Sequence, residues 1–94
     1  MTKERKIQIL MKDRCTRKEA EYFLQTGTII FEADEMIKYF ESYMNEWFPE
    51  NEIEPKERAE NIEQFRNMVY KNIPLKDWSI IEDNGEKFYI MYVL

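Results

Sequence analysis

The strongest constraint on the fold lies near the C-terminus, where Asn84-Gly85 separates two runs rich in β-branched and aromatic residues. A type I′ turn needs positive φ at both central residues, and Asn-Gly adopts it readily. In the second run, residues 87–94, apolar side chains alternate onto both faces of the strand. An isolated hairpin is marginal in water. It therefore has to pack on helices or gain a third strand, for which residues 28–31 are the candidate.

Four helices are predicted before this hairpin, from apolar residues at helical spacing over 3–13, 17–26, 35–48 and 55–73. Thr16 and Glu19 form a capping box ahead of the second helix. Asp34 is the predicted N-cap of the third helix, and Pro55 suits the first turn of the fourth. A chain of 94 residues provides for one small domain. The expected fold is α+β, with about four short helices, a C-terminal β-hairpin and a third strand near 28–31, in a single domain over 1–94.

The composition argues against an enzyme and against a metal site. Histidine, the commonest general base and metal ligand, is absent. The single cysteine, Cys15, cannot form an internal disulfide or a zinc site, and two glycines are too few for a phosphate-binding loop. We therefore expect no catalytic residue, no metal and no cofactor. Cys15 is either a small buried hydrophobe or a thiol made reactive by nearby basic residues, and the sequence leaves both open.

Basic side chains are concentrated at the start of the chain. Residues 1–18 have a net charge of +5, whereas residues 19–63 have a net charge of −10. A basic helix can contact phosphates in a sequence-independent and salt-sensitive manner. One interpretation of this segment is a solvated helix face, and the other is a small nucleic-acid-binding regulator. The candidate phosphate contacts are Lys3, Arg5, Lys6, Lys12, Arg14, Arg17 and Lys18.

Acidic side chains run from the third predicted helix into the fourth, beside an aromatic cluster that contains Trp47. Such a surface repels nucleic acid, raises the rate of association with basic protein clefts and can imitate phosphate spacing. It can equally be a solvated face that keeps the domain soluble. In the first case the partner is a protein, such as a basic nuclease or nucleoprotein effector. The candidate partner-binding residues are Glu46, Trp47, Glu50, Glu52, Glu54, Glu57 and Glu60.

The remaining expectations concern location and self-association. No window approaches the ~20 apolar residues of a membrane span, and no signal-peptide pattern is visible. We expect no membrane partner and a cytoplasmic location. Aromatic residues make up 15% of the chain, and a homodimer through the hairpin edge would cover part of this excess.

Two segments carry a resemblance to a known group. Residues 15–32, which contain Thr16-Arg17-Lys18-Glu19-Ala20, and the closing hairpin over 74–94 resemble parts of small proteins of bacterial phages and mobile elements. That group includes anti-CRISPR and other anti-defence inhibitors. The resemblance implies a non-enzymatic, protein-binding inhibitor or regulator of a nucleic-acid-handling machine, such as a CRISPR effector nuclease. It also implies that the cytoplasm is that of a bacterium or a phage-infected host. The shared residues form caps and turns, so no functional residue is carried over.

Overall fold

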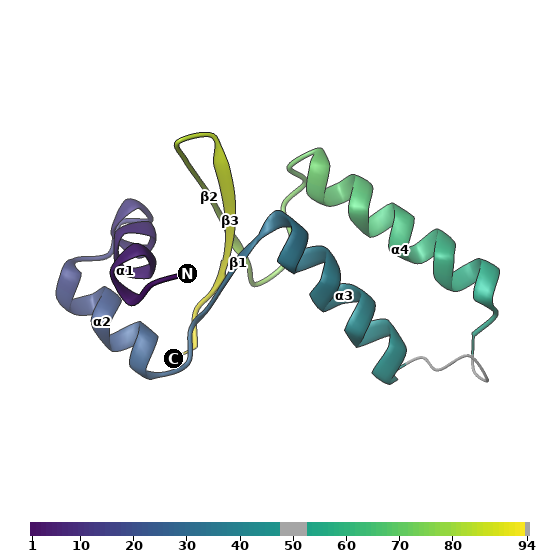
Figure 1. Ribbon diagram of the computed structural model, residues 1–94, viewed down its shortest axis with the longest axis horizontal. Coiled ribbons are helices and arrows are strands. Elements are labelled where there is room, and N and C mark those ends of the chain that lie inside the picture. The colour runs from purple at the N-terminus through teal and green to yellow at the C-terminus, as the bar shows by residue number, and fades with distance from the viewer. Residues whose placement is uncertain (48–52, 94) are drawn as a thin grey trace. The chain divides into compact units, whose positions relative to one another are not determined.

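The structure, a computed structural model, describes residues 1–47 and 53–93 (Figure 1). It confirms the predicted α+β class, with four helices and a three-stranded antiparallel sheet among these residues. The chain divides into two compact units, unit 1 (Met1–Glu32 and Pro74–Leu94) and unit 2 (Ala33–Ile73). The expectation of a single domain stays a prediction. The elements in chain order are α1 (Lys3–Lys12), α2 (Arg17–Gln25), β1 (Ile29–Glu32), α3 (Ala33–Trp47), α4 (Pro55–Tyr70), β2 (Ser79–Asp83) and β3 (Glu86–Met91).

Unit 1 contains the sheet, in the strand order β1-β3-β2. The predicted turn is present, with Asn84 at φ 53° and Gly85 at φ 80°. The strand expected near residues 28–31 is confirmed as β1, which pairs with β3 from Ile29–Met91 to Glu32–Phe88. The last strand is therefore central, and β1 and β2 form the two edges. A homodimer through the hairpin edge would use β2 and stays a prediction.

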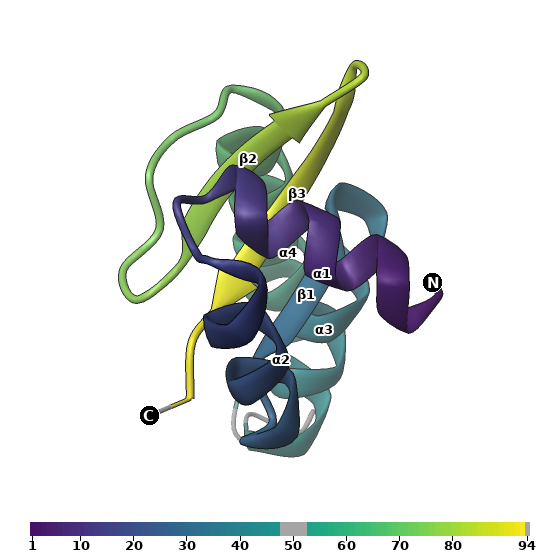
Figure 2. The same cartoon turned by 90° about the vertical axis from the view of Figure 1, so that its left-hand side faces the viewer.

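The alternating apolar residues of β3 predict helices over one face and partial cover over the other, and residues of both faces are buried. On one face, α1 and α2 pack over the sheet (Figure 2). On the other face, Tyr89 is fully buried, and its cross-strand neighbour Phe31 stacks on Trp78 with ring centroids 5.9 Å apart. The core between the two helices and the sheet consists of Ile7, Ile9, Leu10, Ala20, Ile30, Phe88 and Ile90.

Local signals set most helix ends. The capping box is confirmed: the Glu19 N–H donates to Thr16 Oγ1 at 3.1 Å, and the Thr16 N–H donates to Glu19 Oε1 at 3.0 Å. Pro55 is the first residue of α4. The prediction of Asp34 as an N-cap is wrong, because β1 runs directly into α3 at Ala33 and places Asp34 in the first helical turn. The predicted end of the fourth helix is also wrong, since α4 ends at Tyr70 and Asn72 adopts a left-handed conformation at φ 56°.

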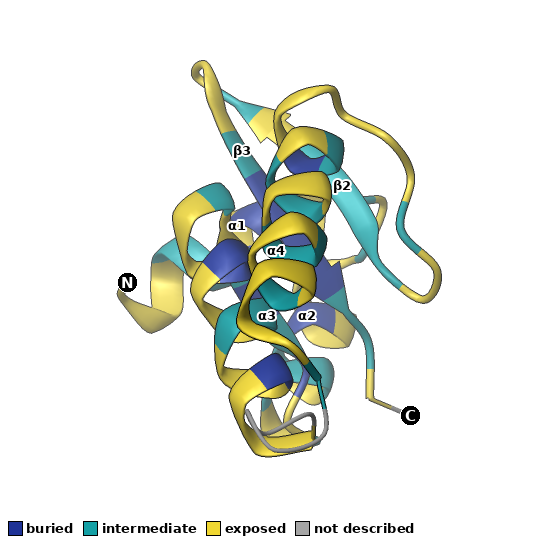
Figure 3. Cartoon of the chain, turned by 90° about the vertical axis from the view of Figure 1, so that its right-hand side faces the viewer, coloured by how far each residue is buried: buried dark blue, intermediate teal, exposed yellow. Residues whose placement is uncertain are grey.

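Unit 2 is a pair of antiparallel helices, α3 and α4 (Figure 1). The rings of Phe40 and Phe65 stack with centroids 4.1 Å apart. Farther along, Arg58 Nη1 donates to Asn45 Oδ1 at 2.7 Å. These contacts place the start of α4 beside the last turns of α3. Buried residues of unit 2 include Met36, Ile37, Met44 and Val69, whereas most of the visible turns of α4 are exposed (Figure 3).

Candidate protein-interaction site

The two units differ in net charge, and the negative charge of the chain lies entirely in one of them. Unit 1 contains nine basic and nine acidic side chains, so it is neutral overall. Unit 2 contains five basic and ten acidic side chains, which account for the whole charge of −5. The positive first segment and the negative middle segment of the sequence therefore do not become two oppositely charged units. Folding combines the basic segment with the acidic residues of α2 and of the hairpin.

Ion pairs engage three of the seven candidate phosphate contacts. Asp83 accepts hydrogen bonds from Arg5 Nη1 at 2.5 Å and from Lys12 Nζ at 3.1 Å, and these hold the pKa of Asp83 below its ordinary value. Arg17 Nη2 lies 2.7 Å from Glu4 Oε2, which holds the pKa of that carboxyl below its ordinary value.

The other four basic residues divide into two pairs. Arg14 and Lys18 are exposed, and Lys3 and Lys6 line a pocket. The seven residues therefore do not form one continuous basic face.

The acidic candidates of unit 2 lie where α3 ends and α4 begins. Glu46 and Trp47 occupy the last turn of α3, Glu54 is the N-cap of α4, and Glu57 lies in the first turn of α4, with Glu60 one turn further. All five are exposed. We call them the acidic end. The other two candidates, Glu50 and Glu52, lie outside the described residues.

The carboxylates of the acidic end remain available for contact. No side-chain hydrogen bond or ion pair joins Glu46, Glu54, Glu57 or Glu60 to another described residue. By contrast, Glu41 in the middle of α3 pairs with Arg66 Nη2 at 3.3 Å. Four carboxylates of the acidic end outnumber the two basic residues beside them, Lys56 and Arg58, so this end of the helix pair carries a net negative charge.

Helix stability explains only part of this arrangement. A carboxylate in the first turn of a helix interacts favourably with the helix dipole, and Glu57 is placed in this way. Glu46 is placed in the opposite way, in the last turn of α3, which contains no basic residue. Such a carboxylate costs about 0.3–1 kcal/mol. The position of Glu46 therefore has no explanation in the stability of its own helix.

An aromatic stripe continues from the acidic end along α3. Tyr39, Tyr43 and Trp47 follow one another at intervals of four residues and are 42%, 42% and 62% exposed. The rings of Tyr43 and Trp47 lie 6.2 Å apart. Tyrosine and tryptophan are enriched at the centres of protein interfaces, where a charged rim surrounds them. The combination of exposed rings and carboxylates is therefore typical of a protein-binding surface.

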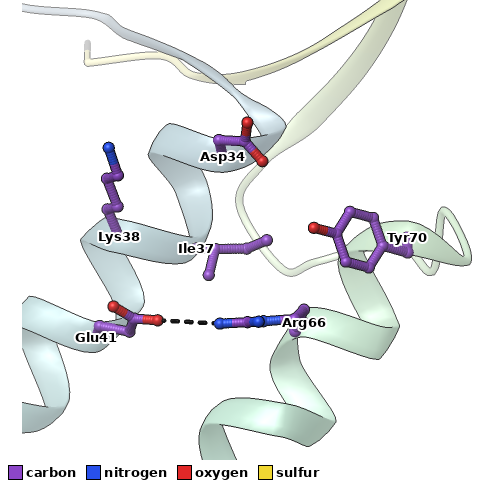
Figure 4. A pocket seen from close by; sticks show the side chains of 6 residues that line it. All are labelled: Asp34, Ile37, Lys38, Glu41, Arg66 and Tyr70. Atoms are coloured by element: carbon purple, nitrogen blue, oxygen red, sulfur yellow. Dashed lines mark hydrogen bonds and ion pairs between the residues drawn. The ribbon is translucent and has the colours of Figure 1, made fainter.

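Sequence reasoning missed a cavity of about 270 Å³ between α3 and α4. Glu41 and Arg66 pair on one side of it, while the Tyr70 hydroxyl points toward Ile37 (Figure 4). Helical spacing relates the lining residues within each helix, but no local spacing relates those of α3 to those of α4, so only the pairing of the two helices reveals the cavity. Its acidic and basic residues balance, and it therefore adds nothing to the negative field of unit 2. The lining residues are Asp34, Ile37, Lys38, Glu41, Arg66 and Tyr70.

Cys15 packs against the core of unit 1 and is half-buried. Its Sγ lies 3.6 Å from the hydroxyl of Tyr92, which donates to Asp13 Oδ2 at 2.5 Å. Burial and the bond to Asp13 raise the pKa of Tyr92. The packing of Cys15 favours the small-hydrophobe interpretation.

Within the described ranges, no group of three or more Cys, Asp or Glu side chains is placed to hold a metal ion. None of the helices described is long and apolar enough to cross a membrane. The chain matches no protein-family model, no curated protein and no solved structure.

Proposed function

We propose that the protein is a non-enzymatic binding module whose acidic end contacts the basic surface of a partner protein. By occupying that surface, it inhibits or regulates a nucleic-acid-handling machine, such as a CRISPR effector nuclease. The observation that carries the proposal is that four exposed carboxylates and the 62%-exposed Trp47 lie where α3 ends and α4 begins, within the unit that holds the whole net charge.

The physical basis is charge complementarity combined with a ring that becomes buried on binding. Proteins that handle nucleic acid present lysine- and arginine-rich clefts to the phosphate backbone. Clustered carboxylates accelerate the encounter with such a cleft, an effect that is screened beyond about 8 Å at physiological salt. Burial of Trp47 would then slow dissociation, since fully desolvated tryptophans are frequent binding hot spots.

The test compares two charge reversals of equal size. Glu46→Lys with Glu60→Lys changes the acidic end, and Glu82→Lys with Glu86→Lys changes exposed positions of unit 1. In the test variant, Lys at position 46 suits the end of α3, whereas Lys at position 60 stands four residues after Lys56 and weakens α4 slightly. In the control, Glu82 faces Lys87 across the two strands, so a lysine there introduces a repulsion. Glu86 faces Asp83, so a lysine there introduces an attraction, and the two effects on the stability of the sheet oppose each other. Thermal unfolding verifies that both variants fold.

The first probe is a nona-arginine peptide titrated into ¹⁵N-labelled protein. We expect amide shifts at the acidic end, association at least tenfold weaker in the test variant, and near wild-type binding in the control. The second probe is DNA cleavage by a CRISPR effector nuclease incubated with each protein, where only the test variant should lose inhibition. Equal effects of the two variants on both probes would show that the acidic end is only a solvated face.

A further inference from the structure

A pocket in unit 1 is lined almost entirely by hydrogen-bond donors. Its volume is about 340 Å³, near the lower end of the ~300–1,000 Å³ typical of small-molecule sites. Lys3 and Lys6 come from adjacent turns of α1, Leu24 and Gln25 from the end of α2, and Thr28 from the residue before β1. None of the described residues that line the pocket is acidic.

Thr28 provides a donor for which the described residues supply no acceptor. It is buried, with only 9% of its surface exposed, and its Oγ1 accepts a hydrogen bond from the Val93 N–H at 3.1 Å. The hydroxyl proton of Thr28 has no acceptor among the described residues. A threonine hydroxyl can accept and donate at the same time, so the bond from Val93 satisfies the oxygen and leaves its donor available. An acceptor atom within the pocket would satisfy this proton.

The two lysines also differ from their neighbours in α1. Arg5 and Lys12 both pair with Asp83, whereas neither Lys3 nor Lys6 forms an ion pair with another described residue. Like charges three residues apart on a helix repel each other. An anion between their ammonium groups would relieve this repulsion and receive charge-assisted hydrogen bonds. Leu24 supplies an apolar surface in the same pocket.

We propose that this pocket binds a small-molecule oxyanion, a carboxylate or a phosphate monoester, that carries a short apolar group. The ammonium groups of Lys3 and Lys6 and the Thr28 hydroxyl donate to the oxyanion, and the Gln25 amide supplies a further donor. The apolar group packs on Leu24. The site is independent of the acidic end, which lies in unit 2.

The experiment follows the amide signals of the ¹⁵N-labelled full chain during titration with matched compounds. Hexanoate and hexyl phosphate test the two headgroups, while hexan-1-ol and hexylammonium lack the anion. Inorganic phosphate lacks the apolar group, and a single-stranded DNA decamer tests for a phosphate-backbone site. The variant Lys3→Gln with Lys6→Gln is compared with the control Arg14→Gln with Lys18→Gln, which removes the same charge from exposed positions of unit 1.

We expect hexanoate or hexyl phosphate to cause saturable shifts of the Lys6, Gln25 and Thr28 amides, and the tighter of the two identifies the headgroup. Removal of both ammonium groups should weaken binding about tenfold or more, since hydrogen bonds to charged groups are the strong ones. The control should bind like wild type, and hexan-1-ol, hexylammonium and inorganic phosphate should bind at least about tenfold more weakly.

The proposal is overturned if neither hexyl anion causes saturable shifts at these amides, or if the control variant loses as much affinity as the lysine variant. It is also overturned if hexylammonium, inorganic phosphate or the decamer binds as tightly as the hexyl anions. If the lysine variant fails to fold, the compounds titrated into the wild-type protein decide the question alone. They show, without any substitution, whether binding requires the negative charge, whether it requires the apolar group and whether a nucleic-acid polymer binds instead.

Discussion

Arg5 and Asp83, 78 positions apart in the chain, are joined by a hydrogen bond of 2.5 Å between Nη1 and Oδ2. The guanidinium group also lies over the Phe88 ring, with Cζ 5.3 Å from its centroid. Lys12 donates to the other oxygen of the same carboxylate. This contact ties α1 to the β2–β3 hairpin and uses two of the basic side chains that the sequence offers to nucleic acid.

Replacing Asp83 with Asn should lower the melting temperature at pH 7 by a few degrees, the scale of a surface ion-pair network. The Arg5 and Lys12 hydrogen bonds hold the folded pKa of Asp83 below its ordinary value of 3.8. The ionised carboxylate therefore stabilises the fold above pH 3.8, and this contribution disappears as the pH falls through the folded pKa. Melting curves at several pH values should show wild type and Asp83→Asn converging in acid. Glu82→Gln is the matched control, and a pH-independent difference would contradict the prediction.

Replacing Tyr92 with Phe should destabilise the protein by about 1–2 kcal/mol at pH 7, because Asp13 loses a hydrogen-bond donor. Burial and the bond to Asp13 raise the folded pKa of Tyr92 above its ordinary value of 10.0. This contribution to stability is complete below pH 10 and declines as the pH rises further. Urea unfolding should show the difference narrowing above pH 10. The exposed Tyr22→Phe serves as the control, and a constant difference up to pH 11 would rule out the proposed linkage.

Replacing Phe65 with Ala should destabilise unit 2 by about 2–4 kcal/mol, because the ring stacks on Phe40 between α3 and α4. Phe65→Leu keeps most of the apolar volume and should lose less than half as much. Urea unfolding followed by amide signals of both units would measure the change. The stacked rings hold α3 against α4, so we expect Phe65→Ala also to shift the amide signals of the acidic end. Unchanged signals there would contradict a role of the rings in positioning that surface.

Binding to random duplex DNA should be undetectable at 150 mM salt. If all seven candidate basic residues contacted phosphates, the slope of log affinity against log salt would be about −6. Three of them are already in ion pairs, and unit 1 is neutral overall. Fluorescence anisotropy at several salt concentrations gives the slope. A value close to −6 would instead support a nucleic-acid-binding regulator acting through α1.

The sequence by itself determined those features that depend on a few adjacent residues. The Thr16–Glu19 box, Pro55 at the start of α4 and the Asn84-Gly85 turn were all predictable, because each follows from the backbone geometry of a single turn. The alternation in β3 likewise predicted a strand covered by helices on one face and partly covered on the other. Local reasoning failed at Asp34, where β1 leads directly into α3 and leaves no residue between them to act as a cap.

Only the tertiary structure decided which charges remain available. Along the chain, residues 1–18 are a basic segment, but the fold brings Asp83 of the hairpin beside Arg5 and Lys12 of α1. The pocket beside Lys3 and Lys6 also requires Thr28, which follows α2 in the sequence and is therefore distant from both lysines along the chain. Electrostatic partners depend on distance in space, whereas caps and turns depend on neighbours in sequence. Composition therefore predicted the number of charges. The fold decided that the carboxylates of the acidic end and the two lysines of the pocket remain without an ion-pair partner among the described residues.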